Sequence, residues 1–380
     1  MRNPGFGIYI HWPFCLSKCP YCDFNSHVAD TIDQGRWRAA LLRELEHFAA
    51  LKPMTEVTSV FFGGGTPSLM DPGTAGALIE RVAALWPTAS GLEITLEANP
   101  STVEADRFRD FRAAGINRLS LGVQALDDAA LKFLGRRHDS GEALRALDIA
   151  GTLFPRFSFD LIYARPGQTP AAWRAELGRA LALAGDHLSM YQLTIEEGTA
   201  FAPAHARGDF QLPPEDEQAE MFEITRALTA QAGLPAYEVS NHARPGGECR
   251  HNLTYWLGGD YVGIGPGAHG RLNNRAFRQH RAPDIWLGRV EANGHATQES
   301  EALDPATRAE ELVMMGLRLA DGIDARTFAA VAGQSLWDVL DVHGLARMEE
   351  GGFVQRTAHG VRATPSGMLV LNALTAEVLG

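Results

Sequence analysis

The sequence predicts an α/β fold, an open and partial (β/α)6 barrel followed by a smaller, mostly helical C-terminal domain. Six β-rich runs alternate with longer runs that carry apolar residues at helical spacing, which is typical of parallel strands with helices outside them. Polar or glycine-rich clusters directly follow five of these runs, and in a β/α barrel such loops gather on one face. A doubly wound sheet is the alternative, but it would concentrate its site at one switch point.

The expected strands are rich in β-branched, aromatic and aliphatic residues, which suit a pleated and buried surface. With the loops that follow them, they are expected at 5–12, 57–68, 92–100, 116–126, 157–169 and 187–199. Helices are expected at about 36–51 and 75–85, and further helices are expected to end near 114, 150 and 184. This order gives one helix between each pair of strands, as parallel pairing requires.

The residue composition and the spacing of apolar residues change twice along the chain, which suggests three parts. They are a barrel at 1–203, a linker and extension at 204–304, and a C-terminal domain at 305–380. In the third part, helical runs flank a hairpin-like stretch at 351–367, a combination that resembles a winged-helix module. We interpret it as a packing domain, because the region of the expected recognition helix is not strongly basic.

Composition excludes several classes of function. The chain has 380 residues, 45% of them hydrophobic, and a formal net charge of −12. An acidic total argues against binding nucleic acid or an anionic membrane, because both need a basic face. No apolar run reaches the length that spans a bilayer, and we see no signal peptide. We therefore expect a cytoplasmic protein.

Three of the four cysteines lie within eight residues, in the loop after the first strand. Cys15, Cys19 and Cys22 have the spacing C-x3-C-x2-C. Structural zinc usually needs four ligands in two pairs, and the remaining cysteine, Cys249, is far away in sequence. Three ordinary buried thiols are a further alternative, which the close spacing disfavours. An iron–sulfur cluster fits better, because three thiolates on a cubane leave one iron open to an external ligand.

This cysteine pattern resembles the radical S-adenosylmethionine (SAM) family, in which the open iron is chelated by the methionine part of SAM. The loop GGGTP at 63–67 matches the family loop whose backbone holds the amino group of SAM. Glycines allow a backbone to approach a ligand closely. Further stretches resemble the branch of oxygen-independent coproporphyrinogen III oxidase; they are YIHWPFC, FFGGGTPS, LEANP, SLGVQALDDAALKFLGRRH, FDLIYARPGQT and GIGPGAHG.

The resemblance implies a set of polar and glycine residues around SAM and the cluster. These residues are Tyr9, Tyr21, Gly64, Gly65, Thr66, Glu97, Gln124, Arg136 and Asp160. Glu97 would bind the ribose hydroxyls, and the glycines with Thr66 would contact SAM. Taken singly, each has an ordinary structural alternative, such as a helix-cap neighbour for Glu97 or a solvated surface charge for Arg136.

Two features set this chain apart from the oxidase itself. The oxidase pattern has a further cysteine where this chain has Phe24, and the relatives with phenylalanine there resemble haem chaperones. The stretch HNLTYW at 251–256 matches a motif of that group. It suggests His251 as an axial ligand of haem iron, with Tyr255 and Trp256 as apolar walls. A histidine satisfied by hydrogen bonds in the core is the alternative, and Cys249 is interpreted as a buried thiol.

We therefore expect a haem chaperone with three cofactors or ligands: a [4Fe–4S] cluster, SAM and haem. Its partners would be haem-accepting proteins, which include membrane-associated ones. The alternative is a coproporphyrinogen III oxidase, which carries out a radical oxidative decarboxylation of a porphyrinogen. A radical enzyme for an unrelated substrate is a third possibility. The sequence leaves open the identity of the haem acceptor and whether SAM is cleaved.

Overall fold

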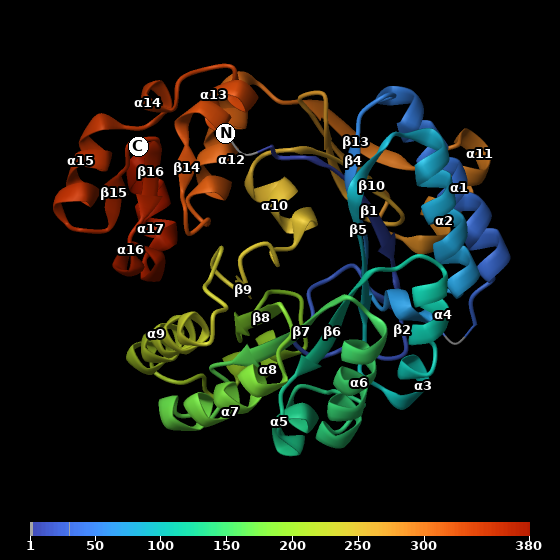
Figure 1. Cartoon of the computed structure of the whole chain (residues 1–380), viewed down its shortest axis with the longest axis horizontal. Helices are drawn as coiled ribbons and strands as arrows, with labels where there is room; N and C mark the ends of the chain where they lie inside the picture. The colour runs from blue at the N-terminus through green and yellow to red at the C-terminus, as the bar shows by residue number, and fades with distance from the viewer. Residues whose placement is uncertain (1–2, 30) are drawn as a thin grey trace.

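The computed structural model describes residues 3–29 and 31–380. Their main sheet has eleven strands in the order β13-β12-β11-β10-β1-β4-β5-β6-β7-β8-β9. The sheet curves but its two edge strands do not pair, so it forms an open barrel rather than a closed one (Figure 1). This confirms the predicted α/β fold with a partial barrel.

All six predicted strands are present, and each pairs in parallel with the next. They are β1 (Phe6–Trp12), β4 (Val57–Gly64), β5 (Thr88–Ala98), β6 (Arg118–Gln124), β7 (Arg156–Tyr163) and β8 (His187–Gln192). Most of their side chains are buried, because a parallel sheet is covered on both faces. Their carboxyl ends, and the loops that follow, lie at one end of the barrel.

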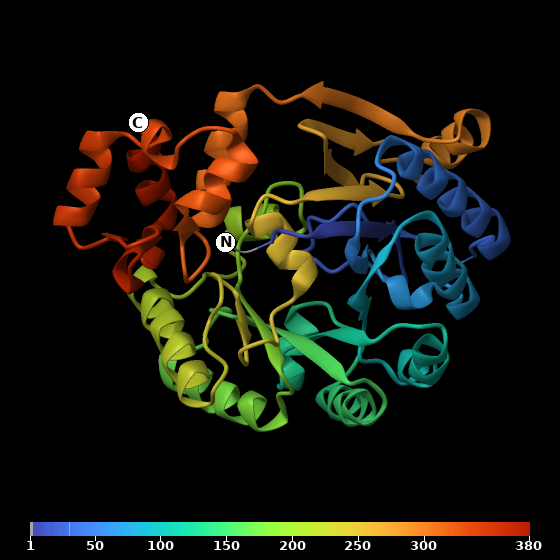
Figure 2. The same ribbon diagram turned by 45° about the horizontal axis from the view of Figure 1, so that its top comes forward.

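The helices between these strands, and the two helices that follow β8, lie along the outer side of the curved sheet (Figure 2). They are α1 (Gln34–Leu51), η1 (Pro67–Leu69), α2 (Pro72–Leu85), α3 (Thr102–Ala105), α4 (Phe108–Ala113), α5 (Asp128–Phe133), α6 (Ser140–Leu153), α7 (Pro170–Leu183), α8 (Phe201–Ala206) and α9 (Glu215–Gln231). Several begin at side-chain caps that satisfy free backbone N–H groups; Asp139, for example, forms a capping box with Glu142 at the start of α6.

The segment 204–304 adds strands to both edges of the same sheet. On one side, β9 (Asn241–Ala243) pairs antiparallel with β8. On the other side, β10 (Asp260–Ile264) pairs in parallel with β1. The remaining elements are α10 (Arg250–Trp256), β11 (His269–Leu272), β12 (Arg275–Gln279), α11 (Pro283–Asn293) and β13 (Thr297–Ala302). Because it crosses from one edge to the other, this segment also packs α10 against β1, β4 and β10.

The C-terminal part has its own hydrophobic core and a three-stranded sheet in the order β14-β16-β15. Its elements are α12 (Pro305–Gly316), β14 (Ile323–Asp324), α13 (Ala325–Ala332), α14 (Leu336–Val339), α15 (Val342–Glu350), β15 (Val354–Arg356), β16 (Gly360–Ala363), α16 (Pro365–Leu369) and α17 (Leu371–Leu379). Phe222 and Val239 from the preceding segment pack against this core. The helices and small sheet agree with the expected winged-helix-like arrangement.

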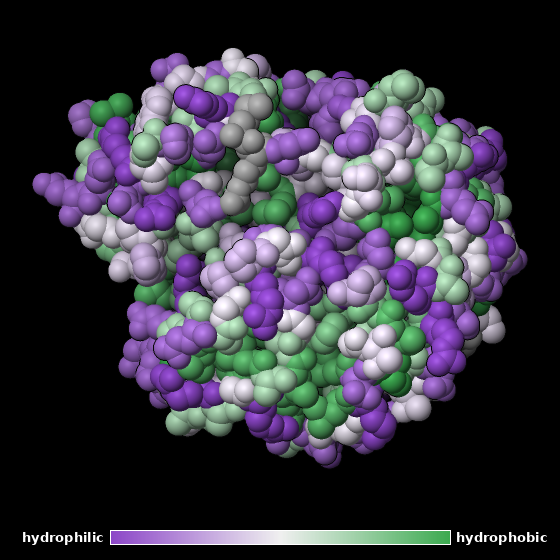
Figure 3. Space-filling view, in the orientation of Figure 1, coloured by the Kyte–Doolittle hydropathy of each residue, from purple (hydrophilic) through white to green (hydrophobic). Residues whose placement is uncertain are grey.

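The surface is polar over most of the face seen in Figure 3. Its most continuous apolar area lies in the lower part of that view, where Figure 1 shows α5, α6 and α8. Among the described residues, no helix is both long enough and apolar enough to cross a lipid bilayer.

Candidate functional site

The three clustered cysteines lie at the carboxyl end of the barrel, on the loop that follows β1. Cys15 ends the short strand β2 (Phe14–Cys15), which pairs with β3 (His27–Val28). The Thr66 hydroxyl donates to Cys15 Sγ at 3.3 Å, and Arg136 Nη1 donates to Cys19 Sγ at 3.4 Å. The backbone N–H of Cys22 donates to the carbonyl of Cys19 at 3.1 Å. All three thiols are free and line one cavity of about 370 Å³.

The arrangement of donors suits an iron–sulfur cluster better than a single metal ion. In the described part of the chain, no three His, Cys, Asp or Glu side chains are placed to hold one ion. A cubane instead takes each thiolate on a different iron, so its ligands are spread apart. Cys249 does not line this cavity; it is buried at the start of α10, where its thiol donates to Glu93 Oε1 at 3.5 Å. Burial raises the pKa of the Cys249 thiol to about 12.

The structure brings the expected SAM residues together. Eight of the nine line the cysteine cavity; they are Tyr21, Gly64, Gly65, Thr66, Glu97, Gln124, Arg136 and Asp160. Tyr9 lines a neighbouring cavity instead. Asn99 is a further member that the sequence reasoning did not single out, although it lies in the LEANP stretch. Its amide oxygen accepts from Arg136 Nη2 at 2.5 Å, and its amide nitrogen donates to Thr66 Oγ1 at 3.3 Å.

Backbone conformation explains the glycine loop. Gly64 has φ = 113°, and a Cβ there would lie 2.7 Å from the ring of His11. A Cβ at Gly65 would lie 2.8 Å from the carbonyl oxygen of Phe14. Both positions therefore need glycine. Gln124 also has a left-handed φ of 71°, and such strained residues cluster at functional sites.

Two carboxyl groups, Glu97 and Asp160, lie half-buried in the barrel mouth. Burial and, to a lesser degree, the nearby Asp160 raise the pKa of Glu97 to about 8, although the Gly64 N–H, which donates to Glu97 Oε2 at 3.2 Å, acts to lower it. Burial likewise raises the pKa of Asp160 to about 6. A cationic ligand bound in this cavity would favour the ionised form of both carboxyl groups and would therefore lower their pKa values.

The raised pKa of Glu97 predicts a pH-dependent stability of the cluster-free protein. Between its ordinary pKa of 4.5 and about 8, the folded protein holds a proton on Glu97 that the unfolded chain has lost. The stabilising contribution is thus complete below pH 4.5 and is lost as the pH rises to 8. As the pH rises through this window, the free energy of unfolding of wild type in urea should fall relative to that of Glu97→Gln by up to about 1.4 kcal/mol per pH unit.

The matched control for this measurement is Glu80→Gln, an exposed change on the outer helix α2. A difference between wild type and Glu97→Gln that stays constant from pH 5 to pH 8 would contradict the assignment of the buried proton to Glu97.

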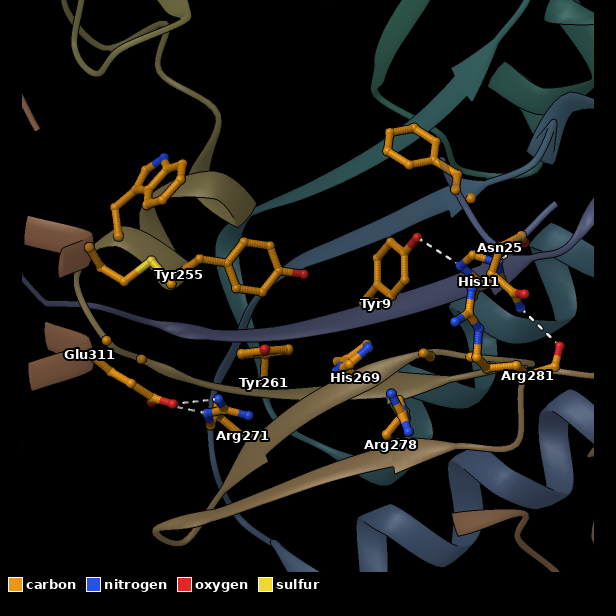
Figure 4. A pocket seen from close by; sticks show the side chains of 18 of the residues that line it. Tyr9, His11, Asn25, Tyr255, Tyr261, His269, Arg271, Arg278, Arg281 and Glu311 are labelled. Carbon is orange, nitrogen blue, oxygen red and sulfur yellow. Dashed lines mark hydrogen bonds and ion pairs between the residues drawn. The ribbon is translucent and has the colours of Figure 1, made fainter. Parts of the chain in front are cut away.

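A second cavity of about 590 Å³ adjoins the first, and the two share Phe24, Gly64 and Glu97. Its volume lies in the usual range for cofactor and ligand sites, roughly 300–1,000 Å³. It is lined by the aromatic residues Tyr9, Phe24, Tyr255, Trp256 and Tyr261 and by the arginines Arg271, Arg278, Arg281 and Arg308. Tyr255 points from α10 toward Tyr9, and the side chains of Arg271 and Arg278 rise from β11 and β12 (Figure 4).

Of the three residues predicted to contact haem, the structure places two in this cavity. Tyr255 and Trp256 line it, whereas His251 is 1% exposed and does not. His251 Nδ1 is hydrogen-bonded to the Ser59 hydroxyl at 2.9 Å, and Nε2 to the Tyr255 hydroxyl at 2.6 Å. Burial lowers the pKa of His251 to about 3. In this arrangement neither ring nitrogen is open to an iron atom, and the predicted iron ligation by His251 stays a prediction.

Comparison with known proteins agrees with this geometry. The family model "Radical SAM superfamily" matches residues 9–177, and the model "HemN C-terminal domain" matches residues 303–370. "Heme chaperone HemW" of Escherichia coli is 38% identical, over 98% of this chain and 98% of that protein. The chain belongs to the HemW branch of the radical SAM superfamily.

Other members of the superfamily match over nearly the whole chain as well. "Radical S-adenosyl methionine domain-containing protein 1, mitochondrial" of Mus musculus is 39% identical, over 98% of this chain and 87% of that protein. Among solved structures, coproporphyrinogen III oxidase (HemN) from Escherichia coli superimposes with a TM-score of 0.82, at 23% identity, over 99% of this chain and 91% of that one. The HemN match establishes the fold of both the barrel and the C-terminal part.

Radical SAM proteins hold a [4Fe–4S] cluster and SAM, and this chain has the residues to do so. Three cysteine thiols, the glycine loop and the carboxyl groups of Glu97 and Asp160 surround one cavity, and the second cavity opens beside it.

Proposed function

We propose that this protein is a haem chaperone, which holds a SAM-binding [4Fe–4S] cluster and passes haem to acceptor proteins. The observation that carries the proposal is similarity over 98% of the chain to a protein named "Heme chaperone HemW". The second cavity supports it, because it offers aromatic walls and positive charge beside the cluster cavity.

Cys15, Cys19 and Cys22 would hold the cluster, with one iron left for the amino and carboxylate groups of SAM. Thr66 and Arg136 fix the positions of two of these sulfur atoms through hydrogen bonds. Such contacts from surrounding side chains orient metal ligands and tune the metal. Bound SAM would supply the ligand that completes the cluster, while Glu97 would accept hydrogen bonds from the ribose.

Haem would occupy the second cavity. Its porphyrin faces are apolar and flat, and Tyr255, Trp256 and Tyr261 present ring surface to the cavity. Its two propionates are negative. Four arginines line the cavity together with three carboxyl residues, Asp23, Glu97 and Glu311, so arginines are in the majority there in a protein whose net charge is −12. An open cavity also suits a cargo that must leave again.

Replacing Trp256 by alanine is expected to weaken haem binding about tenfold or more, because an aromatic wall of the cavity is removed. Wild type should bind about one haem per chain in a saturable titration followed by its Soret band. The matched control is Trp337→Ala on α14, which removes an exposed tryptophan outside the cavity. Absence of saturable binding to wild type would contradict the proposed function.

The second candidate function is coproporphyrinogen III oxidase, which the 0.82 TM-score to HemN and the intact SAM cavity favour. We predict that the protein lacks this activity, because Phe24 takes the place of a cysteine of the oxidase pattern. The measurement is anaerobic incubation of reconstituted protein with coproporphyrinogen III, SAM and reductant. Steady formation of protoporphyrinogen would return the protein to the oxidase class.

A further inference from the structure

His269 is an imidazole that faces the second cavity and makes no hydrogen bond within the described part of the chain. It lies at the start of β11, lines the cavity and is exposed to it. In Figure 4 its ring lies between Tyr261 and Arg278, below Tyr9. A neutral imidazole with open nitrogens is a good ligand for haem iron.

Strand geometry fixes which side chains accompany His269. His269 is directly opposite Arg278 in the antiparallel β11–β12 pair, and Arg271 is opposite Tyr261 in the β10–β11 pair. Opposed side chains share a face of the sheet, and so do residues two apart on one strand. The alternate residues of these strands, which include Leu272, are buried on the other face. One face of three strands therefore presents an imidazole, two arginines and a tyrosine to the cavity.

The arginines differ in what they already bind. Arg271 donates to Glu311 at 2.7 Å, and Arg308 lies 3.5 Å from the same carboxylate. Arg278 pairs with Glu299, but its buried Nε has no hydrogen-bond partner. Arg281 makes no side-chain hydrogen bond or ion pair to any residue that the structure describes, and it is exposed on the loop after β12. Arg281 is thus fully available for an anion, whereas Arg278, which also lines the cavity, would share its guanidinium between Glu299 and the anion.

His251 has a different role in this geometry. Its two ring nitrogens join Ser59 on β4 to Tyr255 on α10, so it holds the tyrosine in the cavity wall. Ligating iron would require it to break one of these bonds and leave the core, where it also stacks on Phe61 at 5.0 Å between ring centroids. A buried polar group that loses its partner is destabilising, so this exchange is unfavourable.

We infer that His269 is the protein ligand of the haem iron, that Arg278 and Arg281 bind the haem propionates, and that His251 is a positioning residue for Tyr255. The inference rests on the proposed function, because it takes haem as the occupant of the second cavity. Transfer to an acceptor would exchange one coordinate bond for another: the bond from iron to His269 breaks and a bond to a donor of the acceptor forms. Haem moves intact, and no electron is gained or lost.

The iron ligand is tested with reconstituted full-length protein and ferric haem. His269→Ala is expected to lose the absorbance and electron paramagnetic resonance signature of imidazole-ligated iron and to bind haem about tenfold more weakly; added imidazole should restore the signature. His280→Ala, a change just after β12 and outside the cavity, is the matched control. His251→Ala should keep the signature with weaker binding. His269→Gln provides a second variant, and retained cluster absorbance shows that each variant folds.

The outcomes separate the inference from the proposed function. If only His251→Ala or another histidine variant loses the signature, the inference is wrong while the chaperone function stands. If wild type binds no haem, the proposed function itself fails. Iron-free protoporphyrin IX adds an internal check, since His269→Ala should leave its affinity unchanged. A loss with this probe would assign His269 to the cavity wall instead.

The propionate sites are tested with haem and its dimethyl ester, in which both carboxylates are blocked. Wild type should bind free haem about tenfold or more tightly than the ester, and Arg281→Gln should reduce this ratio of affinities. Arg281→Gln should also weaken the binding of haem and of protoporphyrin IX by similar factors. Arg289→Gln, on the exposed side of α11, is the control. Equal affinity of wild type for haem and its ester would overturn the arginine assignment.

Discussion

Replacing Cys15, Cys19 and Cys22 together by alanine is expected to abolish the [4Fe–4S] cluster, from about four iron and four sulfide per chain to none. The three thiols line one cavity at the carboxyl end of the barrel, and the described residues offer no other cysteine there. Without thiolates, nothing soft remains to hold iron. The measurement is iron and sulfide analysis after anaerobic reconstitution, with the visible absorbance of the cluster as a second readout.

The matched control is Cys249→Ala, which removes a buried thiol that lies outside the cavity and bonds to Glu93. It should leave the cluster content unchanged. Two results would contradict the assignment: a cluster that persists in the triple variant, or wild-type protein that takes up only zinc.

The barrel and the cavity lined by the cysteines could be predicted from sequence because their signals are local. Each strand run is followed by its own loop, and parallel pairing brings those loops to one end. Cys15, Gly64 and Glu97 therefore converge although they lie on three different units. The missed contact of Asn99 with Arg136 follows the same rule, since Asn99 is the first residue of the loop after β5.

The second cavity could not be predicted in this way because its walls come from segments far apart in the chain. Tyr9, Tyr255, Arg271 and Met315 meet only because β10 pairs with β1 and brings the later strands alongside. The HNLTYW stretch forms an element that lines this cavity, but sequence does not tell which side of a short helix faces the core. Here His251 faces inward and Tyr255 lines the cavity, and the imidazole open to that cavity is His269.

Buried carboxylates outside the cavities escaped prediction for a similar reason. Glu44 on α1 accepts hydrogen bonds from the backbone of Gly265 at 2.8 Å and Ala296 at 2.9 Å and from the Trp286 indole at 2.9 Å. These three donors lie more than two hundred residues away in the sequence. Periodicity places Glu44 on a helix, but only the assembled fold supplies its partners.

Replacing Glu93 by alanine is expected to destabilise the protein by about 3 kcal/mol or more, because several buried groups depend on this one carboxylate. Glu93 Oε1 accepts from the backbone N–H of Arg250 at 2.9 Å and of His251 at 3.4 Å, at the start of α10. Glu93 Oε2 pairs with Arg156 Nη1 at 2.6 Å. Its negative charge also acts on the buried Arg118. Alanine would remove this charge from Arg118 and one of the two carboxylates that pair with Arg156, which would keep its ion pair with Asp186.

Because α10 carries Tyr255 and Trp256, the loss of Glu93 should reach the second cavity as well as the stability of the fold. The expected pattern is a lower free energy of urea unfolding and weaker haem binding, with unchanged cluster content at a temperature where the variant is folded. Glu93→Gln is the matched control: it keeps an oxygen that can accept from the start of α10 but loses the charge that faces Arg156, so its effects should be intermediate. If Glu93→Ala unfolds within about 1 kcal/mol of wild type and binds haem equally well, the carboxylate does not anchor α10, and the cavity wall must be held by the Ser59–His251–Tyr255 hydrogen bonds alone.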